Sequence, residues 1–173
     1  SIKEVNINME SYNLGVVLDR IYEFIWNEFC DWYIEIVKTR LYDKQCKTRN
    51  TAQYVLNKVL GDSLKLLHPF MPFITEKIYG CLYNDDESIM ISKYPEFNEK
   101  DIYENEEKFI EEIKTIVVEI RNIRAKMNVH PSRKVELIFV TSKYENEIVS
   151  SKDFIQKLGF GSSIKVQEDK TGI

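Results

Sequence analysis

Residues 16–42 read VVLDRIYEFIWNEFCDWYIEIVKTRLY and contain both tryptophans of the chain. No glycine or proline interrupts this stretch, so it can form one helix of roughly seven turns, at about 3.6 residues per turn. Apolar residues recur every three or four positions, which predicts a buried helical face. They are Leu18, Ile21, Tyr22, Ile25, Phe29, Trp32, Tyr33 and Ile36. We therefore expect this helix to lie centrally in a helical bundle.

One narrow row of the same helix is polar. It consists of Asp19, Glu23, Asn27, Asp31 and Glu35. Steps of four residues place these side chains on one face of an α-helix, which Ile34 and Lys38 join towards the C-terminal end. Amides, carboxylates, an ammonium group and an apolar contact are what proteins use to read unpaired RNA bases. A plain solvated edge is the competing interpretation. The aromatic side chains of Trp26, Phe29, Trp32 and Tyr33 are expected in the core.

Further helices follow this stretch. The pattern predicts long helices over residues 51–67 and 101–127. Between them Pro69 disfavours helix at His68, and Pro72 is suited to begin a short helix over 72–82. Its apolar neighbours are expected in the core: Phe70, Met71, Phe73, Ile74, Ile78 and Tyr79. Residues 84–100 are expected to cross the surface, with SIMIS (residues 88–92) as a very short strand.

The pattern changes after Asn128. Residues 135–141 and 163–166 are predicted strands, separated by one or two short helices over residues 144–158. The sequence therefore predicts a mainly α fold. An antiparallel helical bundle, with its first helix truncated, would occupy residues 1–130, and a small α+β appendage would occupy residues 131–173.

Composition excludes several classes of protein. The formal net charge is −4 over 173 residues, which argues against a general nucleic-acid coat protein. Three cysteines without a CxxC pair support neither a disulfide framework nor a zinc site, so a reducing cytosol is the simplest setting. No apolar run approaches the roughly 20 residues that cross a bilayer. The chain begins at Ser1 without a methionine, and we expect it to be a segment of a larger protein.

No catalytic constellation is recognisable. The sequence has no Gly-rich phosphate loop, no Gly-x-Ser-x-Gly and no His-Glu-x-x-His motif. The acidic row lacks the Glu-x-x-His motifs of a di-metal carboxylate bundle. His68 and His130 each precede a proline, and we expect both to be turn or capping histidines. We therefore expect no catalytic residue, metal or cofactor within the chain.

A basic segment follows the third long helix. Residues 120–135, IRNIRAKMNVHPSRKV, contain five basic residues and no acidic one: Arg121, Arg124, Lys126, Arg133 and Lys134. Because the segment spans the end of a helix and the start of a strand, its charges should gather at one corner of the fold. This concentration favours RNA binding through phosphates. Ordinary cations at a helix C-terminus are the competing interpretation.

Three segments carry a family resemblance: EFIWNEFCDWYIEIVK (residues 23–38), LLHPFMPFITEKIY (66–79) and IRNIRAKMNVHPSRKV (120–135). In order and spacing they resemble the anticodon-binding domain of class I aminoacyl-tRNA synthetases, and within it the valine-specific enzymes of bacterial type. The resemblance covers most of residues 12–140. It implies a helical bundle that grips the anticodon stem and loop of valine tRNA. It also implies a cytoplasmic monomer that binds neither DNA nor a membrane.

The resemblance also implies roles for particular residues. The anticodon would be read by Asp31, Ile34, Glu35 and Lys38, to which the polar face of the helix adds Asn27. Backbone phosphates would be held by Arg121, Arg124, Lys126 and Arg133, to which the basic segment adds Lys134. Such phosphate contacts position an RNA without specifying its sequence.

Members of this family use ATP with Mg²⁺ in the full-length enzyme, through HIGH and KMSKS signatures that do not occur here. Neither the catalytic domain nor the editing domain is present, so the chain should be inactive alone. The equivalent module of an isoleucine- or leucine-specific enzyme, and a helical protein-interaction scaffold, remain open.

Overall fold

The computed structural model describes residues 1–83, 88–130, 132–141 and 144–168. The chain forms two compact units, Ser1–Lys100 (unit 1) and Asp101–Ile173 (unit 2), which are considered separately. Helices dominate the described residues and one small two-stranded sheet accompanies them, so the predicted mainly α fold is confirmed. The predicted domain boundary at residue 130 stays a prediction, because a compact unit in space need not coincide with a domain.

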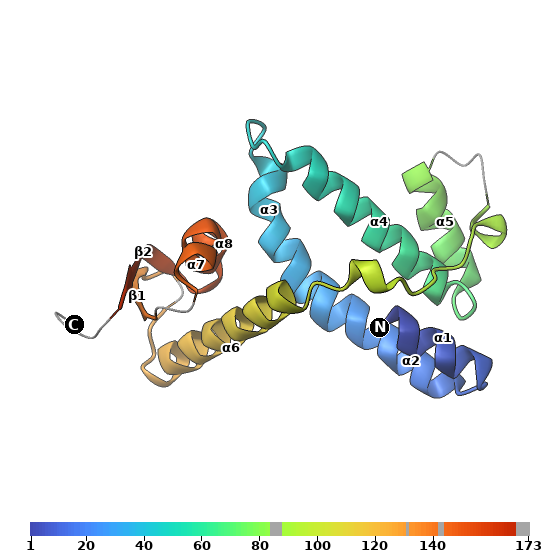
Figure 1. The fold of residues 1–173 in the computed structure, drawn as a ribbon, viewed down its shortest axis with the longest axis horizontal. Coiled ribbons are helices and arrows are strands. Elements are labelled where there is room, and N and C mark those ends of the chain that lie inside the picture. Colours follow the sequence, from blue (N-terminus) through green and yellow to red (C-terminus); the bar gives the residue numbers. More distant parts are fainter. Residues whose placement is uncertain (84–87, 131, 142–143, 169–173) are drawn as a thin grey trace. The chain divides into compact units, whose positions relative to one another are not determined.

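The long aromatic stretch of unit 1 forms one unbroken run of helix that changes direction between α2 and α3 and is called the rod below (Figure 1). It begins as the α-helix α2 (Leu14–Glu23), continues as the π-helix η1 (Phe24–Ile34) and ends as α3 (Glu35–Tyr42). The predicted extent of the helix is therefore confirmed. Its predicted α geometry is wrong in the centre, where π-type hydrogen bonds join residues i and i+5.

The first ten residues form a helix of their own, α1 (Ile2–Glu10), beside α2. Val5 is fully buried against Val17 and Ile21 of α2 and Leu66 of α4 (Arg49–Leu67). This cluster is the first of two cores in unit 1. It explains why a short segment of weak helical pattern is ordered, since burial of one apolar face outweighs its marginal propensity.

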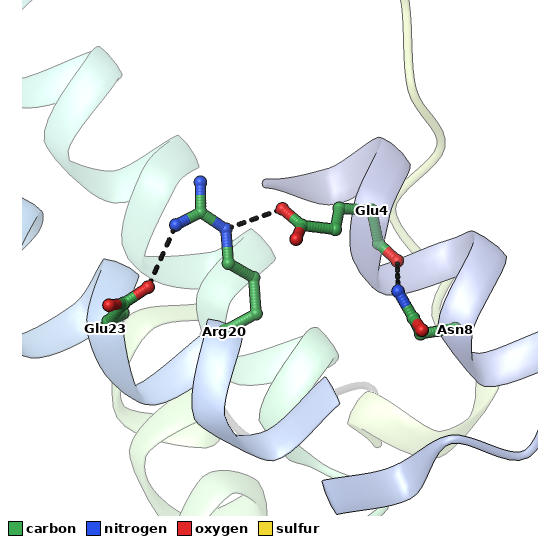
Figure 2. Close-up of polar contacts among 4 residues, drawn as sticks. All are labelled: Glu4, Asn8, Arg20 and Glu23. Atoms are coloured by element: carbon green, nitrogen blue, oxygen red, sulfur yellow. Dashed lines mark hydrogen bonds and ion pairs between the residues drawn. The ribbon is translucent and has the colours of Figure 1, made fainter. Parts of the chain in front are cut away.

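Arg20 of α2 ties the first two helices together at their surface (Figure 2). Its Nε lies 2.9 Å from a carboxylate oxygen of Glu4 in α1, and its Nη1 donates to Glu23 at 3.1 Å. The Arg20 side chain is 37% exposed and that of Glu4 53%, so water screens the pair. Such a pair contributes about 0–1 kcal/mol, and the apolar cluster beneath it supplies more of the stability.

The second core of unit 1 joins α4 to α5 (Pro72–Tyr83) through Leu64, Tyr79 and Ile89. Ile89 belongs to the 3₁₀-helix η2 (Ile89–Ile91), so the predicted strand over residues 88–92 is wrong. The Ser88 hydroxyl accepts a hydrogen bond from the Met90 amide and caps this turn. A second 3₁₀ turn, η3, spans Glu99–Asp101.

Several aromatic and aliphatic residues predicted in the core are exposed instead. Phe73 of α5 is 90% exposed and Trp26 of η1 is 56% exposed, stacked parallel to Tyr22 at 6.3 Å between ring centroids. Other exposed side chains from the predicted core are Leu18, Tyr22, Met71, Ile74 and Ile78. Periodicity identifies an apolar face, but whether another element covers that face depends on the tertiary arrangement.

Unit 2 places a long helix against a small βαβ arrangement. The helix α6 (Glu104–Lys126) precedes β1 (Val135–Val140), and the short helices α7 (Glu145–Ser150) and α8 (Lys152–Leu158) lead to β2 (Gly161–Gln167). The two strands pair in parallel, with Glu136 opposite Ser163 and Val140 opposite Gln167. The helical crossover makes this pairing possible. The core residues are Phe109, Ile113, Val117, Leu137, Phe139, Ile148, Phe154, Ile155 and Leu158.

Candidate nucleic-acid interface

The π geometry of η1 changes which predicted reading residues share a face. Asn27, Asp31 and Ile34 all lie in η1, where each turn takes more residues than in an α-helix. The seven steps from Asn27 to Ile34 make nearly two turns of an α-helix, but only about one and a half turns of a π-helix. Asn27 and Asp31 are accordingly exposed, whereas Ile34 is half-buried. Ile34 therefore lies away from the exposed row that contains Asn27.

The other two predicted reading residues, Glu35 and Lys38, occupy the first turn of α3 and are half-buried. The Lys38 ammonium donates to the Glu35 carboxylate, three residues earlier on the helix. This hydrogen bond raises the pKa of Lys38 above its usual value. Together the two side chains present an acceptor and a donor at one place, and the exposed Asp31 lies four residues before Glu35.

The predicted basic corner lies in unit 2, and its members differ in their surroundings. Arg124 of α6 is only 7% exposed. Its Nη2 donates to the carbonyl oxygens of His130 at 2.9 Å and Arg133 at 2.6 Å, and its guanidinium lies 5.4 Å from the centroid of the Phe160 ring. These contacts hold the loop between α6 and β1. Arg124 therefore stabilises the basic corner from within, and its buried guanidinium is not accessible to a phosphate.

Arg121 is exposed but also makes structural contacts. Its Nε donates to the Leu158 carbonyl at 3.2 Å, and its guanidinium lies 5.8 Å from the Phe160 ring centroid. The Phe160 ring therefore contacts two arginine side chains of α6. Phe160 lies between two glycines and has a φ of 55°. The sequence predicts no role for Phe160, because nothing in a local pattern links residues so far apart in the chain.

The remaining members of the basic corner are exposed: Lys126, Arg133 and Lys134. Lys126 ends α6, and the other two lie in the loop that Arg124 holds. Lys134 also borders a pocket of about 260 Å³ with Lys157 and Phe160. These three side chains are the ones that are open to an anionic strand.

Both histidines are held in turns, as predicted. His68 Nδ1 lies 2.8 Å from the hydroxyl of Thr75, which is fully buried and also donates to the Met71 carbonyl. His130 Nδ1 lies 2.8 Å from the Ser132 hydroxyl. Within the part of the chain that the structure describes, no three His, Cys, Asp or Glu side chains form a group able to hold a metal ion. Over the same part, no helix is both long and apolar enough to cross a membrane.

A family model for the anticodon-binding domain of tRNA ligases matches residues 1–139. The chain belongs to this family. The match spans all of unit 1, including the α2–η1–α3 rod, and in unit 2 it extends through α6 into β1.

Curated relatives of this chain are valine–tRNA ligases. The protein of Clostridium acetobutylicum is 40% identical over 170 residues, which cover 98% of this chain and 19% of the relative. The protein of Aquifex aeolicus is 39% identical over 160 residues, which cover 85% of this chain and 14% of the relative. The protein of Thermotoga maritima is 43% identical over 137 residues, which cover 79% of this chain and 16% of the relative. The chain therefore spans about a fifth or less of the length of these relatives.

Proposed function

We propose that this chain is the anticodon stem-loop binding module of a valyl-tRNA synthetase, with valine tRNA as its partner. The observation that carries the proposal is the match of residues 1–139 to the anticodon-binding family, together with the similarity to the three valine–tRNA ligases named above. The whole enzyme would ligate valine to its tRNA with ATP and Mg²⁺. Those reactions would take place outside this chain, which would be inactive alone, cytoplasmic and monomeric.

Within the module, specificity and affinity would come from different surfaces. Asn27, Asp31, Glu35 and Lys38 would contact the edges of unpaired anticodon bases, and Ile34 would support this surface from its half-buried position. Lys126, Arg133 and Lys134 would bind phosphates, which adds affinity without sequence preference. Arg121 and Arg124 would contribute by holding Phe160 and the loop between α6 and β1 in place.

A titration with RNA tests the proposed function. The chain should bind a valine anticodon stem-loop more tightly than an isoleucine anticodon stem-loop at about 50 mM salt, with affinity falling linearly in log salt concentration. Tighter binding of the isoleucine stem-loop would favour an isoleucine-type module, and equal affinity for both would contradict the assignment to a valine-specific module. Absence of salt-dependent binding to either RNA would contradict the proposal and favour the protein-interaction scaffold.

Glu35→Ala should reduce the preference for the valine stem-loop over the isoleucine stem-loop by roughly 5- to 150-fold, because a lost base-edge hydrogen bond is worth about 1–3 kcal/mol. Glu119→Ala, which removes an exposed carboxylate from the middle of α6, is the matched control. The ratio of the two dissociation constants is the measurement. An unchanged ratio in Glu35→Ala would show that the reading surface lies elsewhere.

Neutralising the exposed basic corner should weaken binding to both stem-loops alike. In the triple variant Lys126→Gln, Arg133→Gln, Lys134→Gln, each lost phosphate contact should lower the affinity roughly fivefold at 0.1 M salt and reduce the slope of log K against log salt by about 0.7. The triple variant Lys100→Gln, Lys108→Gln, Lys152→Gln removes the same charge from other exposed positions. Equal salt slopes for the two triple variants would exclude a specific role for the corner.

A further inference from the structure

The segment that joins the end of α3 to the start of α4 carries a concentration of positive charge, of which the proposed reading surface uses only Lys38. Residues 38–49 contain five basic residues and one acidic residue, in a chain of formal net charge −4. The basic residues are Lys38, Arg40, Lys44, Lys47 and Arg49. Four exposed side chains at the end of α3 and in the turn after it define what we call the hairpin tip: Arg40, Tyr42, Lys44 and Lys47.

All four side chains of the hairpin tip are exposed, Tyr42 by 78%. Within the described residues, Arg40, Lys44 and Lys47 form no ion pair with a carboxylate. The one nearby acidic residue, Asp43, uses its carboxylate to accept the Gln45 amide at 2.9 Å. The positive charges therefore have no described carboxylate partner within the chain.

The turn is held in one conformation by its own hydrogen bonds. Arg49 Nε donates a hydrogen bond to the Leu41 carbonyl at 3.0 Å. The backbone amide of Cys46 donates to the carbonyl of Asp43, and that of Arg49 donates to the carbonyl of Cys46. The backbone that carries the hairpin tip is thus defined before any ligand arrives. Figure 1 shows it as the narrow loop that connects the end of α3 with the start of α4.

Helix electrostatics do not account for this charge. A cation near the C-terminus of α3, such as Arg40, is favoured by the helix macrodipole. Lys47 and Arg49, however, lie at the N-terminus of α4, where the same dipole disfavours cations. The rod before α3 carries exposed acidic side chains, Asp19 and Glu23 in α2 and Asp31 in η1. An anionic strand that approaches unit 1 would therefore be attracted to the hairpin tip.

We propose that the hairpin tip binds the tRNA backbone beside the anticodon loop, with Arg40, Lys44 and Lys47 on phosphates and Tyr42 packed against a nucleotide. This proposal rests on the proposed function. The tip is continuous with the reading surface, since Tyr42 lies about 10 Å along α3 from Glu35 at 1.5 Å per residue. Positive charge interleaved with an exposed aromatic ring is the usual composition of a surface that binds single-stranded RNA.

Charge removal at the tip tests the proposal on the whole chain. The double variant Lys44→Gln, Lys47→Gln should bind the valine anticodon stem-loop roughly 25-fold more weakly at 0.1 M salt, with a salt slope smaller by about 1.4. The double variant Lys77→Gln, Lys93→Gln, which neutralises two exposed lysines elsewhere in unit 1, should match the wild type. Circular dichroism should show the same helicity for both double variants.

Tyr42 provides a second, independent readout. Tyr42→Ala should lose roughly tenfold in affinity, whereas Tyr42→Phe should keep it, because the ring and not the hydroxyl packs on the nucleotide. Lysine acetylation with and without RNA should show Lys44 and Lys47 protected and Lys77 unprotected.

The outcomes separate the two proposals. If the wild-type chain does not bind the stem-loop, both the proposed function and the hairpin tip are overturned. If the wild type binds but the two double variants have equal salt slopes, only the hairpin tip is overturned. Equal affinities of Tyr42→Ala and the wild type would show that Tyr42 does not contact a nucleotide.

Discussion

Arg124→Ala is expected to lower the free energy of unfolding of unit 2 by about 2–4 kcal/mol. The guanidinium is 7% exposed and donates to the carbonyl oxygens of His130 and Arg133, so its loss leaves both acceptors without this partner. It also removes the cation that lies over the Phe160 ring. Such a loss affects the α6–β1 loop first, because Arg124 connects its two ends.

The matched control is Lys126→Ala, two positions further along α6, whose side chain is exposed. Its effect on stability should stay within about 0.5 kcal/mol. Hydrogen exchange followed by mass spectrometry should show faster exchange in β1 and the end of α6 for Arg124→Ala only. If Arg124→Ala instead keeps wild-type exchange but loses RNA affinity, Arg124 is a phosphate ligand, as the sequence alone predicted.

Phe29→Ala is expected to cost about 3–5 kcal/mol of stability in unit 1, the range for removing a buried aromatic side chain. Phe29 is the buried residue of η1, 4% exposed, and stacks on Tyr33 at 5.7 Å between ring centroids. Because η1 also carries Asn27 and Asp31, the variant should weaken RNA binding as well. Thermal unfolding by circular dichroism measures the first effect, and the stem-loop titration measures the second.

Trp26→Ala is the control for this prediction. Trp26 lies three residues before Phe29 in the same π-helix and has a larger side chain, but it is 56% exposed. Its removal costs only the stacking with Tyr22 and a partly buried ring, about 1 kcal/mol or less. Equal destabilisation by the two substitutions would show that Trp26 is buried in the folded chain and would contradict this assignment.

The helices of this protein were largely predictable, because each has a strong local pattern. Pro72 begins α5, and the aromatic stretch forms one uninterrupted rod with Asn13 at its N-cap. The π segment was not predictable, since the aromatic spacing of residues 24–34 fits an α-helix equally well. The π-helix places Ile34 away from the exposed row that contains Asn27. The prediction that both residues share one face assumed α-helical geometry and is wrong for Ile34.

The candidate site was predictable in composition but not in burial. The five basic residues from Arg121 to Lys134 were visible as a charge pattern. That Arg124 is buried depends on Phe160, which comes 36 residues later in the chain and which no local periodicity connects to it. The charge at the α3–α4 turn was also visible, but only the exposure of its side chains distinguishes it from an ordinary polar turn.

The sequence by itself determined the mainly α fold, the positions of the helices and membership in the anticodon-binding family, because these depend on short-range periodicity and on motifs that are contiguous in the chain. Only the tertiary structure decided which apolar and charged side chains are covered. Burial depends on neighbours that are distant in sequence: Val17 and Leu66 cover Val5, while Trp26 and Phe73 stay exposed. For the same reason Arg124 supports the basic corner from within, and Lys126, Arg133 and Lys134 remain open on its surface.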